Sequence, residues 1–390
     1  MCGFTVFFIF VVAVFTYRQY IPKTTVELRK TATEKLFAMT PSVLQSPQDE
    51  ALKRKGYDVI LSTPCLVVLA GNHSHKRYAV FSSNWDGDSF TYSFLLPLTA
   101  LAWRRIGYGS VVLIVGELQK WRSTPARNHI LESTLEQGAI VVFLQGAPSV
   151  NSVMLSQVGR LFAAALVPFN GSSDSVLVTS DADIWPMKAA TYDLPSGRTS
   201  IVSINAFCCG YFRHNGTAYR LLPLSNFVAN LTTWRKLIRR HTVLPSCAGD
   251  ILTYAESVFG ATARNAVVKG GNVGWNMDQY IMSMWVDDWQ RHFGNGSVAY
   301  VRRDCGQDRI DRISWAPRTL HGAIDAHVLL ESHEERTWKR VRPLLNLLYG
   351  KTSSEFRWCE RYQRLFLKLI SNKMSLSTKA TDAVPLLKKH

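Results

Sequence analysis

Two aspartates one residue apart, Asp181 and Asp183, follow the apolar run of the stretch SVLVTSDADIWPM (175–187). Neighbouring carboxylates repel each other, and both ionise at neutral pH only when a positive charge is close. Mg²⁺ and Mn²⁺ prefer oxygen ligands, and a bound ion of this kind neutralises the charge that develops on a departing diphosphate. The pair therefore predicts a divalent-cation site, and a turn or helix-capping role for the two carboxylates is the alternative.

The elements around this pair favour the cation site, because Asp-x-Asp alone is a weak motif. A second copy, Asp86 and Asp88, is interpreted as a loop or turn. Composition and periodicity predict strands over 78–83, 110–117, 139–146 and 174–181, and helices over 93–107, 126–138 and 152–168. This alternation is typical of βαβ units, which bind ligands beyond the carboxyl ends of parallel strands. We therefore expect an α/β fold with the aspartate pair at the ligand-binding edge of the sheet.

Four motifs between residues 78 and 330 resemble those of the GT-A-fold nucleotide-sugar glycosyltransferases, particularly the glycogenin-like group. They are FSSNW (81–85), the Asp-x-Asp, GWNMDQYI (274–281) and LHGAIDAHVL (320–329). The resemblance implies a GT-A-like, Rossmann-type mixed sheet flanked by helices. It also implies that Asp181 and Asp183 bind Mn²⁺ or Mg²⁺, and through the metal a nucleotide diphosphate, most often UDP-linked.

The same resemblance implies roles for further residues. Ser83 and Asn84 would hold uridine, and Arg160, on the helix before the Asp-x-Asp strand, would contact the donor. Asp278 and Gln279 would face the sugar and the acceptor, although Asp278 also suits a helix N-cap. Asn226 would contact the donor sugar or serve as an ordinary turn residue.

A histidine after the last core strand is a common third metal ligand in that group, and this sequence offers His321 and His327. We prefer His327, because Asp325 two positions earlier can orient its ring, although each is equally well a core histidine. The lysine-proline-tryptophan tail of the group is absent after this histidine.

The predicted function is a metal-dependent glycosyltransferase of the hexosyltransferase class, acting on a glycan or protein hydroxyl. Asp278 would either deprotonate the acceptor or stabilise the positive transition state, and the sequence does not choose between retention and inversion. One alternative is a haloacid-dehalogenase-type phosphatase with Asp181 as nucleophile and Asp287 and Asp288 as an acidic metal pair. Another is a non-catalytic lumenal protein that binds nucleotide sugars or glycans.

The N-terminal run 2–17 is uninterrupted and apolar, and we interpret it as an uncleaved membrane anchor. The expected organisation is an anchor (1–17), a stem (18–55), a GT-A-like catalytic domain (56–335) and a basic, helical C-terminal extension (336–390). Cations follow the anchor and none precedes it, which by the positive-inside rule would keep the body cytosolic. Five Asn-x-Ser/Thr sequons favour the lumen instead: Asn72, Asn170, Asn215, Asn230 and Asn295. We therefore expect a single-pass type II glycoprotein of the Golgi or endoplasmic reticulum with a lumenal body.

The composition of the chain limits the classes of binding partner that can be expected. The chain has 390 residues, 47% of them hydrophobic, and a net charge of +16, which suits anionic lipid, acidic glycans or nucleotide phosphates. No recognition helix is evident, and the aromatic residues do not alternate with Lys and Arg, so nucleic acid is not expected as a partner. The seven cysteines permit disulfides but have no zinc-site spacing, and the vicinal Cys208 and Cys209 are interpreted as structural.

Overall fold

The computed structural model describes residues 57–71, 75–84, 89–146, 152–169, 174–265, 269, 272–302, 308–317 and 322–381, with side chains up to 371. All of them lie in the unit Gln48–His390. The expected anchor and stem (1–55), the second Asp-x-Asp and His321 lie outside the described residues. Within the described part of the chain, no helix is long and apolar enough to cross a membrane.

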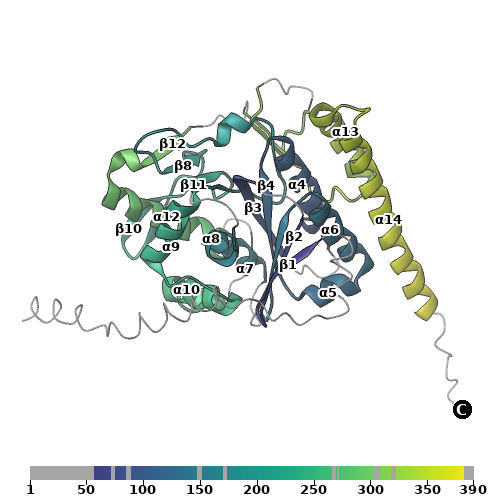
Figure 1. The fold of residues 1–390 in the computed structure, drawn as a ribbon, viewed down its shortest axis with the longest axis horizontal. Coiled ribbons are helices and arrows are strands. Elements are labelled where there is room, and N and C mark those ends of the chain that lie inside the picture. The colour runs from purple at the N-terminus through teal and green to yellow at the C-terminus, as the bar shows by residue number, and fades with distance from the viewer. Residues whose placement is uncertain are drawn as a thin grey trace, which may run out of the picture. The chain divides into compact units, whose positions relative to one another are not determined.

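A sheet of nine strands forms the centre of the fold, in the order β1-β2-β5-β4-β3-β6-β11-β8-β12 (Figure 1). Its strands are β1 (Asp58–Ser62), β2 (Leu66–Ala70), β3 (Arg77–Asn84), β4 (Gly109–Val115), β5 (Ile140–Leu144), β6 (Val176–Thr179), β8 (Ile201–Ile204), β11 (Phe227–Asn230) and β12 (Val298–Val301). The four predicted strands are the central β5-β4-β3-β6, and they are mutually parallel. The predicted α/β alternation is thereby confirmed.

Helices cover both faces of the sheet (Figure 1). Along β4, Val112 and Ile114 join one apolar core, while Val111 and Leu113 join the other. The first core is covered by α4 (Leu96–Arg105), α5 (Leu118–Ser123), α6 (Pro125–Glu136), α13 (Glu335–Tyr349) and α14 (Ser354–Thr381). The second is covered by α7 (Ser152–Gly159), α8 (Ala163–Leu166), α9 (Leu231–His241), α10 (Ala248–Phe259), α11 (Ala261–Arg264) and α12 (Val273–Phe293). Burial on both faces explains why β4 reads as a continuous apolar run.

The two C-terminal helices are part of the first core. Trp338 of α13 and Tyr362 and Phe366 of α14 are buried there. The ring of Tyr362 stacks on Phe94 at 5.1 Å, and its hydroxyl donates to the Phe94 carbonyl at 2.8 Å. The segment 336–371, expected as a basic extension, therefore packs its apolar side on the sheet layer and keeps its cations outside.

Smaller elements complete the fold. A three-stranded sheet joins β13 (Arg309–Ile310), β14 (Asp325–His327) and β7 (Ile184–Pro186), and β9 (Tyr211–His214) and β10 (Thr217–Arg220) form a hairpin. The register of β14 with β7 pairs His327 with Ile184, the residue after Asp183. This small sheet therefore brings β13 and β14 against the end of β6.

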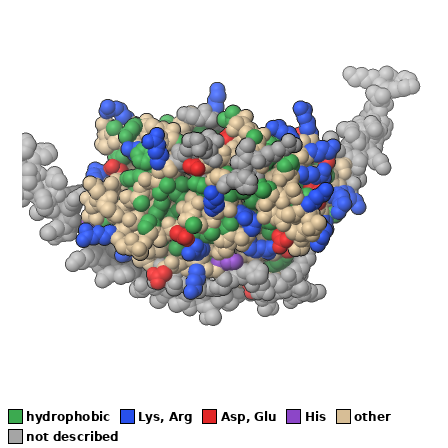
Figure 2. Space-filling model, turned by 90° about the horizontal axis from the view of Figure 1, so that it is seen from above, with side chains coloured by type: hydrophobic (Ala, Val, Ile, Leu, Met, Phe, Trp, Pro, Cys, Tyr) green, Lys and Arg blue, Asp and Glu red, His purple; other side chains and the backbone are tan. Residues whose placement is uncertain are grey.

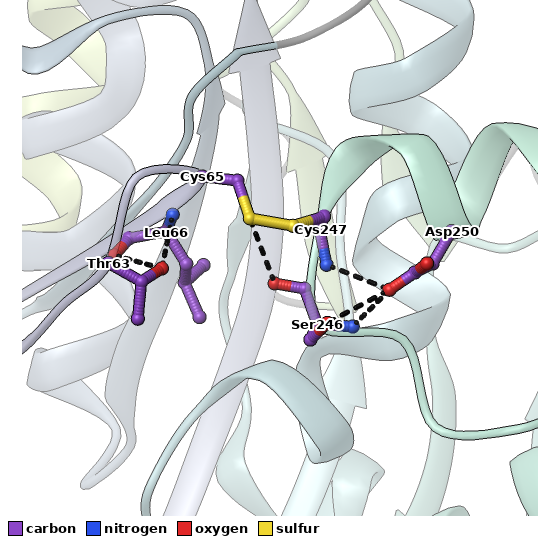
Figure 3. The surroundings of a disulfide bond; sticks show 6 residues. All are labelled: Thr63, Cys65, Leu66, Ser246, Cys247 and Asp250. Atoms are coloured by element: carbon purple, nitrogen blue, oxygen red, sulfur yellow. Dashed lines mark hydrogen bonds between the residues drawn. A yellow bond between two sulfur atoms is a disulfide. The ribbon is translucent and has the colours of Figure 1, made fainter. Parts of the chain in front are cut away.

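Two disulfides are present among the described cysteines. Cys65, in the turn between β1 and β2, bonds to Cys247 at the start of α10, and Asp250 accepts from the Cys247 backbone amide at 3.2 Å (Figure 3). Cys208 and Cys209 form the second, vicinal bond, and Cys359 is free and buried. The vicinal cysteines, interpreted as structural from the sequence, are thus bonded to each other.

Candidate active site

The sheet topology gathers the candidate residues at one edge. Ser83 and Asn84 end β3, while Asp181 and Asp183 follow β6, its parallel neighbour. β11 runs antiparallel to β6, so Asn226, which precedes β11, lies at the same edge. This is the carboxyl edge of the parallel strands, where ligands bind in α/β sheets.

Arg160 joins two of the candidate carboxylates. It lies in a short 3₁₀ turn, Arg160–Phe162, and only 7% of its surface is exposed. One terminal nitrogen donates to the Asp181 carboxylate and to the Ser180 carbonyl at 2.7 Å, and the other donates to Asp278 Oδ2 at 2.6 Å. Buried charges are tolerated only when they are paired in this way. The two terminal nitrogens of Arg160 thus already have partners within the chain.

The two carboxylates on Arg160 titrate differently. Burial raises the pKa of Asp278, and this outweighs the opposing effect of Arg160. For Asp181, burial acts in the same direction, but Arg160 outweighs it and holds the pKa below its ordinary value. Asp278 lies inside α12, and the N-cap of that helix is Asn272, whose side chain accepts from the Trp275 amide. The helix-capping alternative for Asp278 is therefore wrong.

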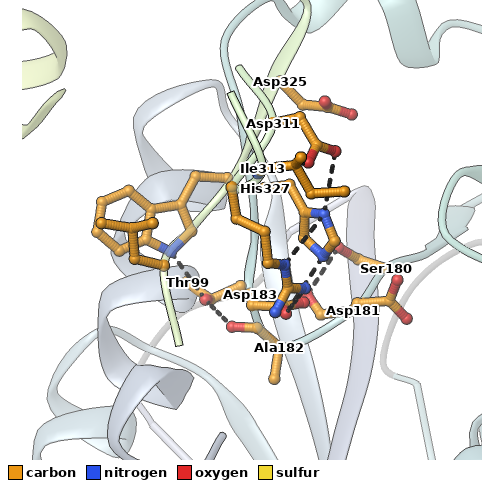
Figure 4. Close-up of polar contacts among 12 residues, drawn as sticks. Thr99, Ser180, Asp181, Ala182, Asp183, Asp311, Ile313, Asp325 and His327 are labelled. Carbon is orange, nitrogen blue, oxygen red and sulfur yellow. Dashed lines mark hydrogen bonds and ion pairs between the residues drawn. The ribbon is translucent and has the colours of Figure 1, made fainter. Parts of the chain in front are cut away.

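A second cluster surrounds Asp183, which is buried (Figure 4). Its Oδ2 accepts a hydrogen bond from the Arg312 guanidinium and lies 3.4 Å from His327 Nε2. The other ring nitrogen of His327 lies 3.4 Å from Asp311 Oδ2 and 3.3 Å from Arg312 Nε. In Figure 4, the Asp181 side chain points away from this cluster, consistent with its bond to Arg160.

The prediction that Asp325 orients the ring of His327 is wrong. Asp325 is fully buried and binds Arg309 through both oxygens, at 2.8 and 3.1 Å. Asp311 is the carboxylate beside the His327 ring instead. Arg309, Asp311 and Arg312 were missed by the sequence reading. The alternation of acids and arginines in DRIDR (308–312) is the signal that marks them.

Asp183 and His327 present two donor groups that fit a divalent cation. Asp183 Oδ2 and His327 Nε2 are 3.4 Å apart, and ligand bonds of about 2.1 Å allow one ion to bind both. Asp181 is directed to Arg160, and within the described ranges no group of three or more His, Cys, Asp or Glu side chains is arranged to hold a metal. Two protein ligands therefore fit, and phosphate oxygens and water would supply the rest of the shell.

Asn226 is held in a strained conformation at the same edge. Its φ is +92°, it is fully buried, and its backbone amide donates to the Thr179 carbonyl at 2.7 Å. Its Nδ2 donates to Asp325 Oδ2 at 3.2 Å, while its Oδ1 has no hydrogen-bond partner among the described residues. Positive φ at a residue other than glycine is costly and clusters at functional sites. The Arg309–Asp325 pair thus fixes the side-chain amide of Asn226 through its Nδ2 atom. The Oδ1 atom of the same amide stays without a partner among the described residues.

The remaining candidates lie around these clusters. Ser83 is buried, and its Oγ has no partner within the described residues, whereas Asn84 Nδ2 donates to Ser152 Oγ at 2.9 Å. Gln279 is half-buried and donates to Asn276 Oδ1 at 3.2 Å. All candidates that the structure describes are thus brought to the carboxyl edge or to the first turns of α12.

The acidic pair required by the phosphatase alternative lies elsewhere. Asp287 binds Arg291 at 2.7 Å, and Asp288 binds Arg240 at 2.9 Å. Asp287 is nine residues beyond Asp278 on α12, about 14 Å along the helix axis. The structure therefore does not bring this pair to Asp181.

The chain is similar to known proteins in its structure alone. No protein-family model matches the chain, and no curated protein matches it. Similar solved structures include the galactosyltransferase LgtC in complex with donor and acceptor sugar analogs, at 16% identity, covering 71% of this chain and 96% of that chain, with a TM-score of 0.39. A glycosyltransferase involved in glycosylation of the major capsid of PBCV-1 matches at 9% identity, covering 67% and 98%, with a TM-score of 0.34.

The glycosyltransferase GlyE of Streptococcus pneumoniae TIGR4 matches at 13% identity, covering 78% of this chain and 64% of that chain, with a TM-score of 0.35. All three are glycosyltransferases, as is the family that the sequence motifs resemble. Each TM-score lies below 0.5, so the function proposed below depends on the chain's own residues.

Proposed function

We propose that this chain is a glycosyltransferase that moves a sugar from a nucleotide-diphosphate donor, a UDP-sugar, to a hydroxyl of a glycan or protein. The observation that carries the proposal is the pair of carboxylates after β6, each bound to a different arginine. One of these arginines, Arg160, also binds the buried Asp278. This arrangement concentrates both signs of charge at the edge where a diphosphate and a reacting sugar would bind.

The residues at this edge suggest a division of roles. Ser83 and Asn84, at the end of β3, would bind the nucleoside. Asp183 and His327 would hold Mn²⁺ or Mg²⁺, which would neutralise charge on the departing diphosphate. Asp181 would join them only by leaving Arg160. Asn226, held by Asp325, would present its free Oδ1 to a hydroxyl of the donor sugar.

Asp278 has the properties of the reacting carboxylate. Its raised pKa makes it a stronger base than an ordinary aspartate, and Arg160 fixes the position of its Oδ2. In an inverting reaction it would take the proton of the acceptor hydroxyl, and in a retaining reaction it would face the positive transition state. Gln279, next to it and half-buried, would contact the sugar or the acceptor.

The cellular setting is also part of the proposal: a type II protein of the Golgi or endoplasmic reticulum membrane with a lumenal body. Two disulfides suit an oxidising compartment. The sequon residues Asn215 and Asn295 are exposed, as glycan attachment requires.

The test is a screen of nucleotide sugars for Mn²⁺-dependent hydrolysis by the full-length protein, read as released nucleoside diphosphate. We expect turnover of a UDP-sugar, reduced about 100-fold or more in Asp183→Asn, since an electrostatic contact to developing charge contributes about that factor. Asp58→Asn, an exposed aspartate of β1, is the matched control and should retain full activity.

Two outcomes would contradict the proposal. One is that no nucleotide sugar is hydrolysed by the wild type, and the other is that Asp183→Asn turns over the donor as fast as the wild type. Cleavage of a generic phosphoester that is lost in Asp181→Asn would support the phosphatase instead.

A further inference from the structure

A group of exposed aromatic side chains follows β8 at the same edge of the sheet. Phe207 is 50% exposed and Tyr211 is 68% exposed, and the vicinal disulfide Cys208–Cys209 between them is exposed as well. We call these four residues the aromatic platform. Exposed large apolar side chains that cluster are a mark of a binding surface rather than of an ordinary solvated loop.

The platform is fixed in place before any ligand arrives. The Arg220 guanidinium lies 4.5 Å from the Phe207 ring centre and 5.3 Å from that of Tyr211, and it donates to the Tyr211 hydroxyl at 3.1 Å. Gly210, with a φ of +72°, lets the chain turn sharply between the disulfide and β9. Rings held by one cation and one covalent bridge lose little conformational entropy when a ligand binds.

Aromatic stacking also connects the hairpin to the helix that carries the candidate catalytic residue. Phe212 of β9 stacks on Tyr280 of α12, with ring centres 4.2 Å apart and planes inclined by 14°. Tyr280 directly follows Gln279. The Leu222 backbone amide, after β10, donates to Ser283 Oγ on the same helix at 2.9 Å. The platform is therefore fixed relative to Asp278 and Gln279.

The sheet order sets the separation between β8, which leads to the platform, and β6, which leads to the aspartate pair. β8 is antiparallel to β11, which is antiparallel to β6, so β8 and β6 run in the same direction and end at the same edge. They are two strand positions apart, about 10 Å at the usual strand spacing. This is the scale of one or two sugar rings. Figure 2 shows apolar side chains gathered on the left of the viewed face, the side on which Figure 1 places β8, β10 and β12, with Lys and Arg around them.

We propose that the aromatic platform binds a pyranose ring of the saccharide acceptor. One face of a pyranose carries several C–H bonds and packs on an aromatic ring, while its hydroxyls point outward to polar groups. The Tyr211 hydroxyl and the partly exposed guanidinium edge of Arg220 supply polar groups beside the rings. This inference rests on the proposed function, because it is the candidate transfer site that makes the occupant a sugar.

The test is saturation-transfer difference NMR on the full-length protein with three probes: lactose, methyl β-D-glucopyranoside and methyl β-D-galactopyranoside. We expect saturation of the C–H protons of at least one probe in the wild type. Phe207→Ala and Tyr211→Ala should each weaken its binding about fivefold, the size of one aromatic stacking contact. The melting temperature of each variant checks that the fold is kept.

Phe293→Ala is the matched control. Phe293 is 49% exposed and also lies beside an arginine, with the Arg240 guanidinium 5.8 Å from its ring centre. It ends α12, which leads to β12 at the opposite edge of the sheet. Its loss should leave the saccharide signals unchanged.

Three results would overturn the proposal. They are a wild type that gives no saccharide signal, platform variants that bind as the wild type does, and a wild-type dimer that dissociates in Phe207→Ala. The last would assign the platform to a second copy of the chain. If the wild type hydrolyses a UDP-sugar but gives no saccharide signal, the proposal that the platform binds a sugar is refuted, and the proposed function is not. If saccharide binds at the platform and no donor is hydrolysed, the proposed transfer fails.

Discussion

Arg312 and His327 meet at the same atom, Oδ2 of Asp183. The guanidinium donates a hydrogen bond to this oxygen, and the imidazole Nε2 lies 3.4 Å from it. A divalent ion bound by Asp183 and His327 would use the lone pairs that Arg312 now occupies. Arg312 and the proposed cation therefore compete for one carboxylate.

The first prediction follows from this competition. Arg312→Gln should bind Mn²⁺ about five- to tenfold more tightly than the wild type, because the ion no longer has to displace a charge-assisted hydrogen bond. Isothermal titration calorimetry without nucleotide measures the affinity. Arg340→Gln, an exposed arginine of α13, is the control and should bind as the wild type does. Unchanged or weaker binding in Arg312→Gln would show that no such competition exists.

The second prediction concerns Arg160. Arg160→Met leaves Asp278, which is 1% exposed, as a buried carboxylate without its cation, and should lower the free energy of unfolding by about 3–5 kcal/mol. Urea denaturation measures the change. The double variant Arg160→Met/Asp278→Asn removes the orphaned charge and should recover part of the loss. A double variant less stable than Arg160→Met alone would contradict this account.

The third prediction concerns His241, which stacks on Trp285 at 5.4 Å. Burial is the main reason that the pKa of His241 falls from 6.5 to about 4. The nearby Arg240 lowers this pKa further, and the carboxylate of Asp288 opposes the shift by raising it. Between these values the unfolded chain binds more protons than the folded one. Stability is therefore complete above about pH 6.5 and falls as the pH drops toward 4, by on the order of 2 kcal/mol.

Chemical denaturation between pH 4 and 7 measures this effect. His241→Gln should flatten the pH dependence in that window, whereas His292→Gln, an exposed histidine near the end of α12, should keep it. If the slope persists in His241→Gln, other groups are responsible for it.

The fourth prediction concerns the Cys65–Cys247 disulfide, which closes a loop of sequence separation 182. Cys65→Ser/Cys247→Ser should reduce the free energy of unfolding by about 2–4 kcal/mol, because the unfolded chain gains freedom. Denaturation without reductant measures the loss. Cys359→Ser, a free cysteine, is the comparison. A double variant as stable as the wild type would mean that the bond is not formed in solution.

The fifth prediction tests the lumenal placement. After expression in secretory cells, Asn215 and Asn295 should carry glycans, since both are exposed. Asn230 should not, because its Oδ1 caps α9 by accepting from the Thr233 amide at 2.7 Å. Mass spectrometry after glycosidase treatment locates the modified sites. Absence of glycan at both Asn215 and Asn295 would favour the cytosolic orientation suggested by the charges after residue 17.

The sequence predicted the parallel centre of the sheet because its strands are apolar runs bounded by helices with clear ends. The long strand β3 and the buried β4 lie close to their predicted limits. The short strands β13 and β14 could not be predicted, since two or three residues carry no periodicity. They are nevertheless the elements that bring Arg309 and His327 to the aspartate pair.

The sequence also could not predict which carboxylate at the site pairs with which cation. Asp325 lies two residues before His327, and that proximity suggested that it orients the histidine ring, yet its carboxylate binds Arg309 on the adjacent strand. Partner choice depends on register between strands rather than on distance along the chain. Trp185, two residues after Asp183, is fully buried, and its Nε1 donates to Thr99 Oγ1 at 3.0 Å, a partner 86 positions away in the chain.

The stacking of Tyr362 on Phe94 has a consequence for biosynthesis. These residues are 268 positions apart, so the ribosome must translate nearly the whole chain before α14 can pack on the first core. Until then the nascent chain exposes the apolar side chains of the first core that α13 and α14 cover in the folded protein. Exposed apolar surfaces of this kind bind chaperones or aggregate. A premature stop codon after residue 335 would leave that surface bare permanently, and the truncated product would be a substrate for quality-control degradation.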